Sequence, residues 1–339
     1  MNVKELNVVA NRMVGNGKGI LATDESSPTI KKRFDSINTE STEEKRRRYR
    51  EMLFTTAGIA DYIGAVILFD ETIHQNTIDG ISFPQYLSDL GIIPGIKVDK
   101  GAKALAGFLG ETVTEGLDGL RERLEEYSSF GAKFAKWRAV IHIGNDIPSD
   151  YCLDANAHAL ARYAALCQEA GIVPIVEPEV LMDGSHSIKR CEEITAVTLD
   201  AVFTELKAHA VVLEGIILKP NMVISGRDAS NRAGPKEVAE ATLRCLKAHV
   251  PVEVPGIAFL SGGQTAKEAT EHLGLMNQMG ELPWELSFSY GRALQAPSLD
   301  AWCGEEANFA AGQEALLKRA KFNSLAHLGM YEVAMESVA

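Results

Sequence analysis

Short apolar runs rich in β-branched residues recur along the chain. Each run is followed by polar or glycine positions and then, in most cases, by a longer segment with helical spacing. Eight such runs occur, at residues 19–24, 63–70, 93–99, 134–140, 172–180, 215–223, 254–262 and 284–291. Strands that are apolar almost throughout are typical of a parallel sheet covered on both faces. The pattern therefore predicts eight buried parallel strands.

Amphipathic segments separate most of these strands. The predicted helices cover residues 42–58, 117–131, 154–171, 187–209, 235–250 and 267–279. Several of them end close to a glycine, which suits a helix stop. Eight strand and helix units in succession, with no linker rich in proline, glycine or serine, favour a closed barrel over an open doubly wound sheet. We expect a single α/β domain over residues 1–339, a (β/α)8 TIM barrel with an N-terminal helical extension and a short C-terminal tail.

Composition and charge narrow the classes of function. The chain has 34 Lys and Arg residues against 46 Asp and Glu residues, a net charge of −12, which argues against nucleic acid as a partner. It contains neither a membrane-length apolar stretch nor a secretory signal, so we expect a cytoplasmic protein without a membrane partner. The five cysteines and eight histidines are scattered. They form no local metal motif, although spacing leaves open ligands gathered from distant segments.

In a (β/α)8 barrel, catalytic groups lie at the carboxyl ends of the strands. In this chain those positions hold, in order, Asp24, Asp70, Lys97, Lys136 with Arg138, Glu177 with Glu179, Lys219, Ser261 with Gly262 and Gly263, and Ser289 through Arg292. A single charged strand end is typical of a salt bridge at the rim. Many charged groups on one rim indicate a functional site, because buried charge is costly unless it is paired or used.

Lysines and carboxylates at this rim suit covalent catalysis. Lys219 follows an apolar run and is the candidate nucleophile, with Lys136 as the neighbouring cation that would favour its deprotonation. Glu177 and Glu179 are two residues apart and so share one face of a strand. One of them can move protons while the other holds a lysine charge. Asp24 suits either a general base or a helix N-cap, and its spacing does not separate the two.

Two groups of residues suit phosphate binding. The segments FLSGGQTAKEA and SYGRALQA each lead from a strand through a glycine turn into a helix, where amide groups bind anions. These loops follow the seventh and eighth strands, a common phosphate position in barrels. A second cationic group, on the opposite side of the mouth, consists of Lys97, Arg138, Lys32 and Arg33 with Ser26 and Ser27. Together the two groups predict a substrate phosphorylated at both ends.

Seven segments in one order resemble the class I fructose-bisphosphate aldolases, the metal-independent family that forms a Schiff base. They are GKGILATDES, GIKVDKG, FAKWR, GIVPIVEPE, LKPNM, FLSGGQ and SFSYGRALQA, and they run from Gly17 to Ala296. The resemblance implies a lyase that reversibly cleaves fructose 1,6-bisphosphate to dihydroxyacetone phosphate and glyceraldehyde 3-phosphate. It also implies a homotetramer that needs no metal or other cofactor. Another Schiff-base barrel, such as a transaldolase, and a non-catalytic sugar-phosphate-binding scaffold are the alternatives.

The resemblance also implies residue roles. Lys219 would form the Schiff base, Glu177 would serve as acid and base in carbinolamine dehydration, and Asp24 would take the C4 hydroxyl proton. Glu179 and Lys136 would position and tune the lysine. The C1 phosphate would be held by Ser261, Gly262, Ser289, Gly291 and Arg292. Lys97, Arg138 and Ser26 would lie toward the C6 phosphate, with Lys32 and Arg33 on the neighbouring helix.

The C-terminal sequence departs from the family pattern. Many members carry a tail ending in a tyrosine that reaches the active site and assists protonation of the enamine at C3, whereas this sequence ends MYEVAMESVA. We therefore expect Tyr331, the short tail or an ordered water to protonate the enamine, or C3 proton exchange to be slow.

Overall fold

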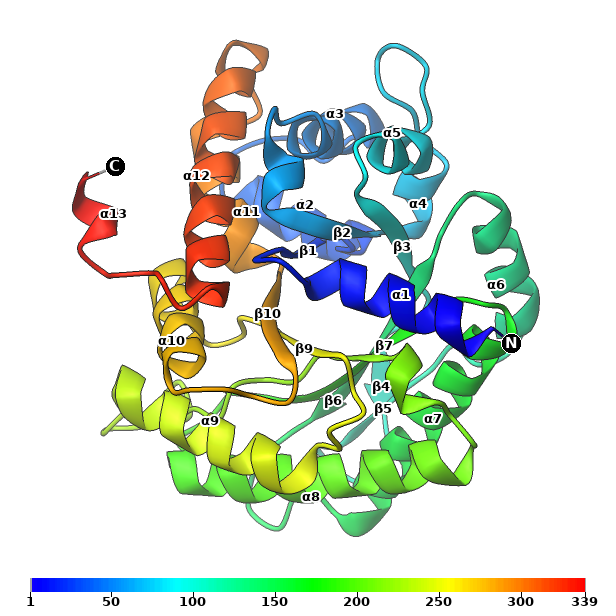
Figure 1. Ribbon diagram of the computed structural model, residues 1–339, viewed down its shortest axis with the longest axis vertical. Coiled ribbons are helices and arrows are strands. Elements are labelled where there is room, and N and C mark those ends of the chain that lie inside the picture. Colours follow the sequence, from blue (N-terminus) through cyan, green and yellow to red (C-terminus); the bar gives the residue numbers. More distant parts are fainter. Residues whose placement is uncertain (1, 339) are drawn as a thin grey trace.

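A closed barrel of eight parallel strands forms the centre of the protein (Figure 1). The computed structural model describes residues 2–338. The strands pair in the circular order β1-β10-β9-β8-β7-β6-β3-β2. Their bounds are β1 Gly19–Ala22, β2 Ile63–Leu68, β3 Ile93–Lys97, β6 Phe134–Ile141, β7 Val173–Val180, β8 Ile217–Leu218, β9 Gly256–Phe259 and β10 Glu285–Tyr290. Each lies within or overlaps one of the eight apolar runs, so the predicted (β/α)8 fold is confirmed.

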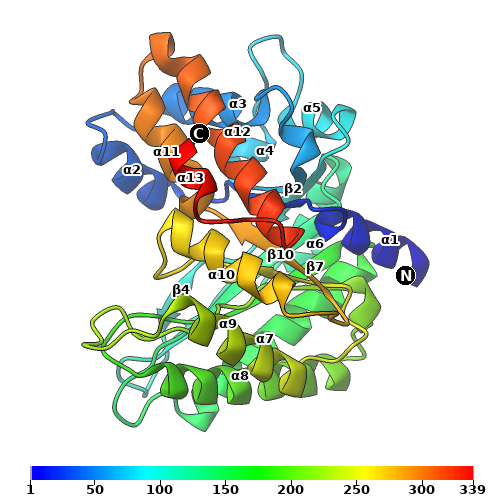
Figure 2. The same cartoon turned by 60° about the vertical axis from the view of Figure 1, so that its left-hand side comes forward.

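Helices surround the barrel, as two views of the ribbon show (Figures 1 and 2). The predicted helices correspond to α3 Glu43–Phe54, α6 Leu120–Ser129, α7 Asp150–Glu169, α8 Ile188–Ala208, α9 Pro235–His249 and α10 Ala266–Gln278. The pattern did not delimit α1 Val3–Val14, α2 Ser27–Asp35, α4 Asp70–Ile73, α5 Phe83–Asp89, α11 Arg292–Trp302, α12 Phe309–His327 or α13 Met335–Val338. Several of these are short or have little sequence periodicity, so they are hard to detect from residue pattern alone.

A small antiparallel hairpin interrupts the regular repeat between β3 and β6. Its strands are β4 Ala102–Ala104 and β5 Thr112–Thr114. All three residues of β4 are exposed. A strand this short and exposed has no buried face and leaves no apolar signature, which is why the sequence did not predict it.

Strand β6 shows how period-two alternation places charge inside the barrel. Trp137 faces outward, where its ring stacks on Tyr163 of α7 with centroids 5.6 Å apart. Lys136 and Arg138, one residue to either side, line the cavity inside the barrel. Successive side chains of a strand point to opposite faces. The aromatic anchor on the outer face therefore fixes the direction of both cations.

Helix α1 closes the amino-terminal end of the barrel. Its buried residues Leu6, Ala10, Met13 and Val14 pack in one cluster with strand residues that include Ile20 and Phe134. At Gly64 of β2, a Cβ atom would lie 2.8 Å from the backbone oxygen of Met13, so glycine allows this close approach. This end of the barrel is filled with apolar side chains, and a ligand must enter from the opposite, carboxyl end.

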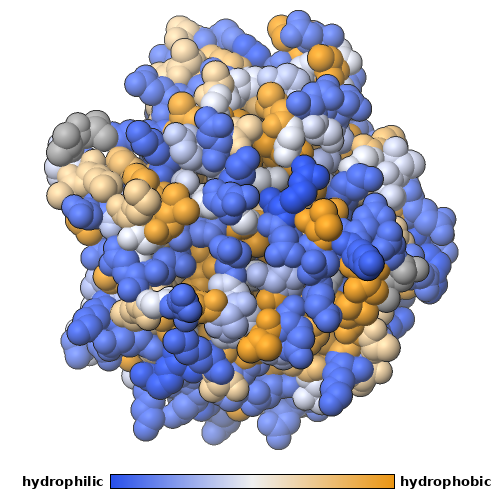
Figure 3. Space-filling view, viewed as in Figure 1, coloured by the Kyte–Doolittle hydropathy of each residue, from blue (hydrophilic) through white to orange (hydrophobic). Residues whose placement is uncertain are grey.

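The outer surface is mostly hydrophilic on the face drawn in Figure 3, with small separate apolar patches. Among the described residues, no helix combines the length and apolarity that a membrane crossing requires.

Candidate active site

A cavity of about 360 Å³ opens at the carboxyl ends of the barrel strands. Its volume lies in the range typical of small-molecule sites. Every residue to which the resemblance assigns a catalytic or phosphate role lines it, except Lys32, and Ser27 of the second cationic group does not line it either. Lys32 is exposed on α2 and does not line the cavity. Asp70 also lies elsewhere, where it accepts a hydrogen bond from the Tyr127 hydroxyl at 2.5 Å. The barrel thus gathers charged residues from most of its strand ends into one enclosed space.

Two lysines and two carboxylates form a connected network in the cavity. The Glu177 carboxylate bridges both lysines, with Oε1 3.2 Å from Lys219 Nζ and Oε2 2.8 Å from Lys136 Nζ. Lys136 Nζ also donates to Asp24 Oδ2 at 3.1 Å. The lysine and glutamate side chains are 4–5% exposed. Four ionisable side chains are therefore held close together, largely shielded from water.

The ionisation of these groups follows from competition between burial and neighbouring charge. Burial raises the pKa of Glu177 and of Asp24, but the ammonium groups of Lys136 and Lys219 outweigh it, and both carboxyl pKa values fall below their ordinary range. Burial lowers the pKa of Lys136, but the carboxylates of Asp24 and Glu177 raise it by more, so the net shift is upward. Asp24, Glu177 and Lys136 are all charged at neutral pH.

The backbone around Lys219 explains its fixed position. Its amide donates to the Val176 carbonyl at 2.8 Å, and the Pro220 carbonyl accepts from Leu260 at 3.1 Å. Because proline has no amide hydrogen to donate, the regular ladder of β8 is interrupted just after Leu218. The predicted strand over residues 215–223 is therefore reduced to Ile217–Leu218. The bond from Lys219 to Val176 on one side and the bond from Leu260 to Pro220 on the other nevertheless hold this segment in place.

Glu179 has a different partner from Glu177. Its Oε2 accepts a hydrogen bond from Arg138 Nε, so its direct ion pair is with this arginine. Sequence spacing placed both carboxylates on one strand face, and both line the cavity. It did not indicate which cation each would meet.

Asp99 is a cavity residue that the sequence reasoning missed. It is buried, pairs with Lys97 Nζ at 3.1 Å through Oδ1, and accepts the Arg138 amide at 3.3 Å through Oδ2. It therefore holds the Lys97 ammonium directly and fixes the backbone of Arg138. The signal was present in GIKVDKG, since a carboxylate two residues after a strand-end lysine favours the same face.

The first strand end removes one of the two interpretations of Asp24, the helix N-cap. Helix α2 begins at Ser27 and its N-cap is Ser26, so Asp24 does not cap it. The next residue, Glu25, was also missed: its buried carboxylate pairs with Arg33 at 2.5 Å and with Arg50 at 2.6 Å. Arg33 thus reaches the cavity wall as part of a buried ion-pair cluster.

The two predicted anion loops present unsatisfied polar groups. The Oγ of Ser289 is buried and has no hydrogen-bond partner among the residues that the structure describes. Helix α11 begins at Arg292 and its N-cap residue, Gly291, supplies no side-chain bond. Free amides at a helix N-terminus favour an anion. The α10 N-terminus carries the capping box of Thr265 and Glu268, so in the first loop the groups still open to an anion would be those of the turn.

Tyr331 lies away from the cavity. Its hydroxyl donates to Glu336 Oε1 at 3.0 Å, and its ring packs against Phe322 of α12. Burial and the Glu336 carboxylate raise its pKa to about 12. The structure therefore does not bring this tyrosine to the predicted site.

Comparisons with known proteins agree on one family. The family model described as "Glycolytic: Fructose-bisphosphate aldolase class-I" matches residues 5–339. A probable fructose-bisphosphate aldolase class 1 of Xanthomonas campestris is 59% identical over 333 residues, covering 98% of this chain and all of the relative. The cytosolic fructose-bisphosphate aldolase 4 of Arabidopsis thaliana is 53% identical over 317 residues, covering 93% of this chain and 81% of that protein.

A solved structure is similar over nearly the whole fold. Fructose-bisphosphate aldolase of Plasmodium falciparum, crystallised with TRAP and a small-molecule inhibitor, superposes with a TM-score of 0.96. The two sequences are 47% identical, and the match covers 97% of this chain and 96% of that one.

Proposed function

The chain belongs to the class I fructose-bisphosphate aldolase family of lyases, and we propose that it cleaves fructose 1,6-bisphosphate through a Schiff base on Lys219. The observation that carries this proposal is the bridging carboxylate of Glu177, 3.2 Å from Lys219 and 2.8 Å from Lys136. A lysine nucleophile needs a proton acceptor beside it and a cation nearby that disfavours its ammonium form. Both are present around this side chain.

The first half of the reaction builds the imine. Lys219 Nζ transfers a proton to the adjacent carboxylate and attacks the C2 carbonyl of the open-chain ketose, forming a carbinolamine. Protonated Glu177 then returns a proton to the carbinolamine hydroxyl, which leaves as water and yields the iminium ion. One carboxylate performs both transfers because it is within hydrogen-bond reach of the nitrogen. Lys136 keeps that carboxylate oriented.

The second half breaks the C3–C4 bond. Asp24, held by Lys136 at 3.1 Å, accepts the proton of the C4 hydroxyl, glyceraldehyde 3-phosphate departs, and the bonding electrons flow into the iminium to give an enamine. Its low pKa keeps Asp24 ionised before the transfer. The iminium is the electron sink, so this mechanism needs no metal or other cofactor. Protonation at C3 and hydrolysis release dihydroxyacetone phosphate and restore Lys219.

The two phosphates fit the two ends of the cavity. We assign the C1 phosphate to Ser261, Gly262, Ser289, Gly291 and Arg292. Within the described chain, Arg292 forms no ion pair with a carboxylate and Ser289 Oγ has no partner, so both are available to an anion. We assign the C6 phosphate to Lys97, Arg138 and Ser26, with Arg33 at the adjacent wall. The exposed position of Lys32 gives it no direct contact in this arrangement.

Borohydride reduction in the presence of fructose 1,6-bisphosphate tests the proposal. We expect a stable adduct on Lys219 by peptide mapping and no adduct in a Lys219→Met variant. A Lys207→Met variant, in which a lysine on the outer helix α8 is changed, is the control and should be trapped like the parent. An adduct on another lysine, none at all, or loss of activity in EDTA would overturn the mechanism.

Turnover measured with two sugar phosphates tests whether the substrate carries one phosphate or two. An aldolase or transaldolase for monophosphorylated sugars would need only one phosphate site, and a scaffold would bind without turnover. We expect turnover with fructose 1,6-bisphosphate well above that with fructose 1-phosphate. We further propose a cytoplasmic homotetramer, which light scattering of the purified chain would test through its mass.

A further inference from the structure

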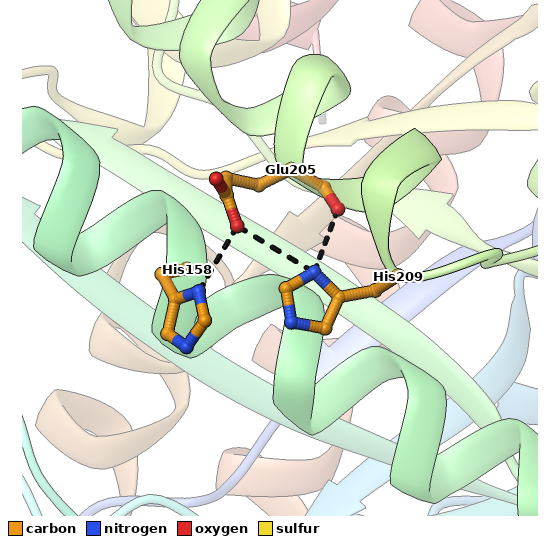
Figure 4. A group of neighbouring side chains, drawn as sticks. All are labelled: His158, Glu205 and His209. Atoms are coloured by element: carbon orange, nitrogen blue, oxygen red, sulfur yellow. Dashed lines mark hydrogen bonds and ion pairs between the residues drawn. The ribbon is translucent and has the colours of Figure 1, made fainter.

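We propose that His158, Glu205 and His209 form a binding site for a transition-metal ion, best suited to Zn²⁺, on the outer surface of helices α7 and α8. His158 comes from the middle of α7, whereas Glu205 and His209 are one turn apart near the end of α8 (Figure 4). None of the three lines the active-site cavity. The site is therefore separate from the proposed aldol chemistry.

The spacing of the three donors is close to that of a tetrahedral site. Oε2 of Glu205 is 3.0 Å from Nδ1 of His158 and 3.5 Å from Nδ1 of His209. One ligand atom from each residue lies within 4.8 Å of the other two. With Zn–N and Zn–O bonds of about 2.0–2.2 Å, neighbouring donors of a tetrahedral ion lie about 3.3 Å apart. The two carboxylate–imidazole distances, 3.0 and 3.5 Å, lie on either side of that separation.

The chemical types of the three donor atoms indicate which metal ion the cluster would bind. Two imidazole nitrogens and one carboxylate oxygen suit Zn²⁺ and related first-row ions, whereas Ca²⁺ and Mg²⁺ prefer oxygen alone. Three protein ligands leave a fourth position for water, as in open zinc sites. The carboxylate also supplies the negative charge that offsets part of the charge on the ion.

Metal binding would change the hydrogen bonding of His209 in this cluster. Nδ1 of His209 lies 2.9 Å from the Glu205 carbonyl and 3.5 Å from the Glu205 carboxylate. A single N–H cannot be directed well at both oxygens. When the ion binds, each neutral imidazole carries its proton on Nε2 and offers the Nδ1 lone pair to the metal. This change of tautomer breaks no covalent bond other than N–H and requires no redox partner.

The cluster is accessible, and it joins two helices. The side chains are 53%, 31% and 22% exposed for His158, Glu205 and His209, so a hydrated ion reaches them without opening the fold. The two imidazole rings lie edge to face, with centroids 4.9 Å apart and an interplanar angle of 69°. An ion held between them links α7 to the end of α8, and linkage between binding and folding then stabilises the native state.

Zinc titration of the metal-stripped full-length chain tests the site. We expect isothermal titration calorimetry to show one ion bound per chain, with the dissociation constant raised at least about tenfold in Glu205→Gln and in His158→Asn. Co²⁺ should give the intense visible absorption of a tetrahedral site in the parent only. Thermal melting of each variant without metal establishes that it is folded, and the exposure of these side chains predicts that it is.

His249→Asn is the matched control. His249 pairs with a single carboxylate, Asp200 at 2.7 Å, and belongs to no three-donor group in the described residues. Its variant should bind zinc like the parent. Zinc binding that is absent in the parent, or that survives unchanged in Glu205→Gln and His158→Asn, would overturn the proposal. Because no substrate is present, either result is independent of the aldolase assignment.

Discussion

Lys219 Nζ and Glu177 Oε1 face each other 3.2 Å apart inside the barrel, in side chains that are both about 95% buried. The opposite oxygen of the same carboxylate is 2.8 Å from Lys136. This pair joins a candidate nucleophile to a candidate acid and base, and the second lysine prevents the carboxylate from turning away.

Replacing Glu177 by glutamine removes the proton acceptor but keeps the shape of the side chain. We expect kcat for fructose 1,6-bisphosphate to fall by about 10²- to 10⁴-fold, the usual contribution of a general acid or base. Steady-state kinetics and the rate of borohydride trapping measure the loss. Glu169→Gln, at an exposed pair with Arg121, is the control and should retain parental activity. Parental trapping by Glu177→Gln would show that another group moves the proton.

The same substitution has a pH-dependent effect on stability. The pKa of Glu177 lies below its ordinary value of 4.5. A carboxyl with a lowered folded-state pKa contributes stability that is complete above the unfolded pKa and is lost as pH falls through the folded one. We expect Glu177→Gln to be less stable at neutral pH, by about 3 kcal/mol for a broken buried pair. The difference should shrink as pH falls below about 4.5. Chemical denaturation at stepped pH measures it, and a difference independent of pH would contradict the ion-pair origin.

Lys97→Ala should discriminate between the two phosphates. Loss of a charge-assisted contact worth about 1.5–3 kcal/mol lowers kcat/KM for the bisphosphate by about 10- to 100-fold. Activity with fructose 1-phosphate, which lacks the C6 phosphate, should change little. Lys32→Ala, on the exposed face of α2, is the matched control. Equal losses on both substrates would place Lys97 elsewhere in the reaction.

Gly262→Ala should disturb the first anion turn. A Cβ atom at this position would lie 2.1 Å from Met182 Cε and 3.1 Å from Glu179 Oε1. Met182 is flexible, so we expect a folded protein with a shifted turn and a KM for the bisphosphate raised about tenfold, equivalent to about 1.4 kcal/mol. Gly234→Ala, where a Cβ meets nothing within 4 Å, should keep the parental KM. An unchanged KM in Gly262→Ala would remove this turn from the phosphate site.

Tyr331→Phe should leave the C3 chemistry intact. The Tyr331 hydroxyl binds Glu336 at 3.0 Å and does not line the cavity. We expect C3 proton exchange of dihydroxyacetone phosphate at the parental rate, measured by NMR in D₂O. The free energy of unfolding should drop by about 1 kcal/mol for the lost hydrogen bond. Slowed exchange would mean that the C-terminal segment moves to the site during turnover.

Many residues of the site were predictable because strand alternation and the position of strand ends can be deduced from the sequence. The period-two spacing of Glu177 and Glu179 places both on one face, and each strand end must reach the same rim once the barrel closes. The hairpin over residues 102–114 and the buried acids Glu25 and Asp99 were not predicted. Glu25 pairs with the distant Arg50, which leaves no periodic trace, whereas Asp99 lies two residues after its partner Lys97 and its period-two signal was overlooked.

The sequence by itself determined the eight strands, the carboxyl rim and the chemical types of residue gathered there, because strand burial and side-chain alternation are set by neighbours along the chain. Only the tertiary structure decided the pairings. It joins Glu179 to Arg138, sets Tyr331 against α12, and brings His158 to Glu205 across two helices. These contacts depend on how separate elements pack and which rotamers that packing allows, and no local pattern encodes either.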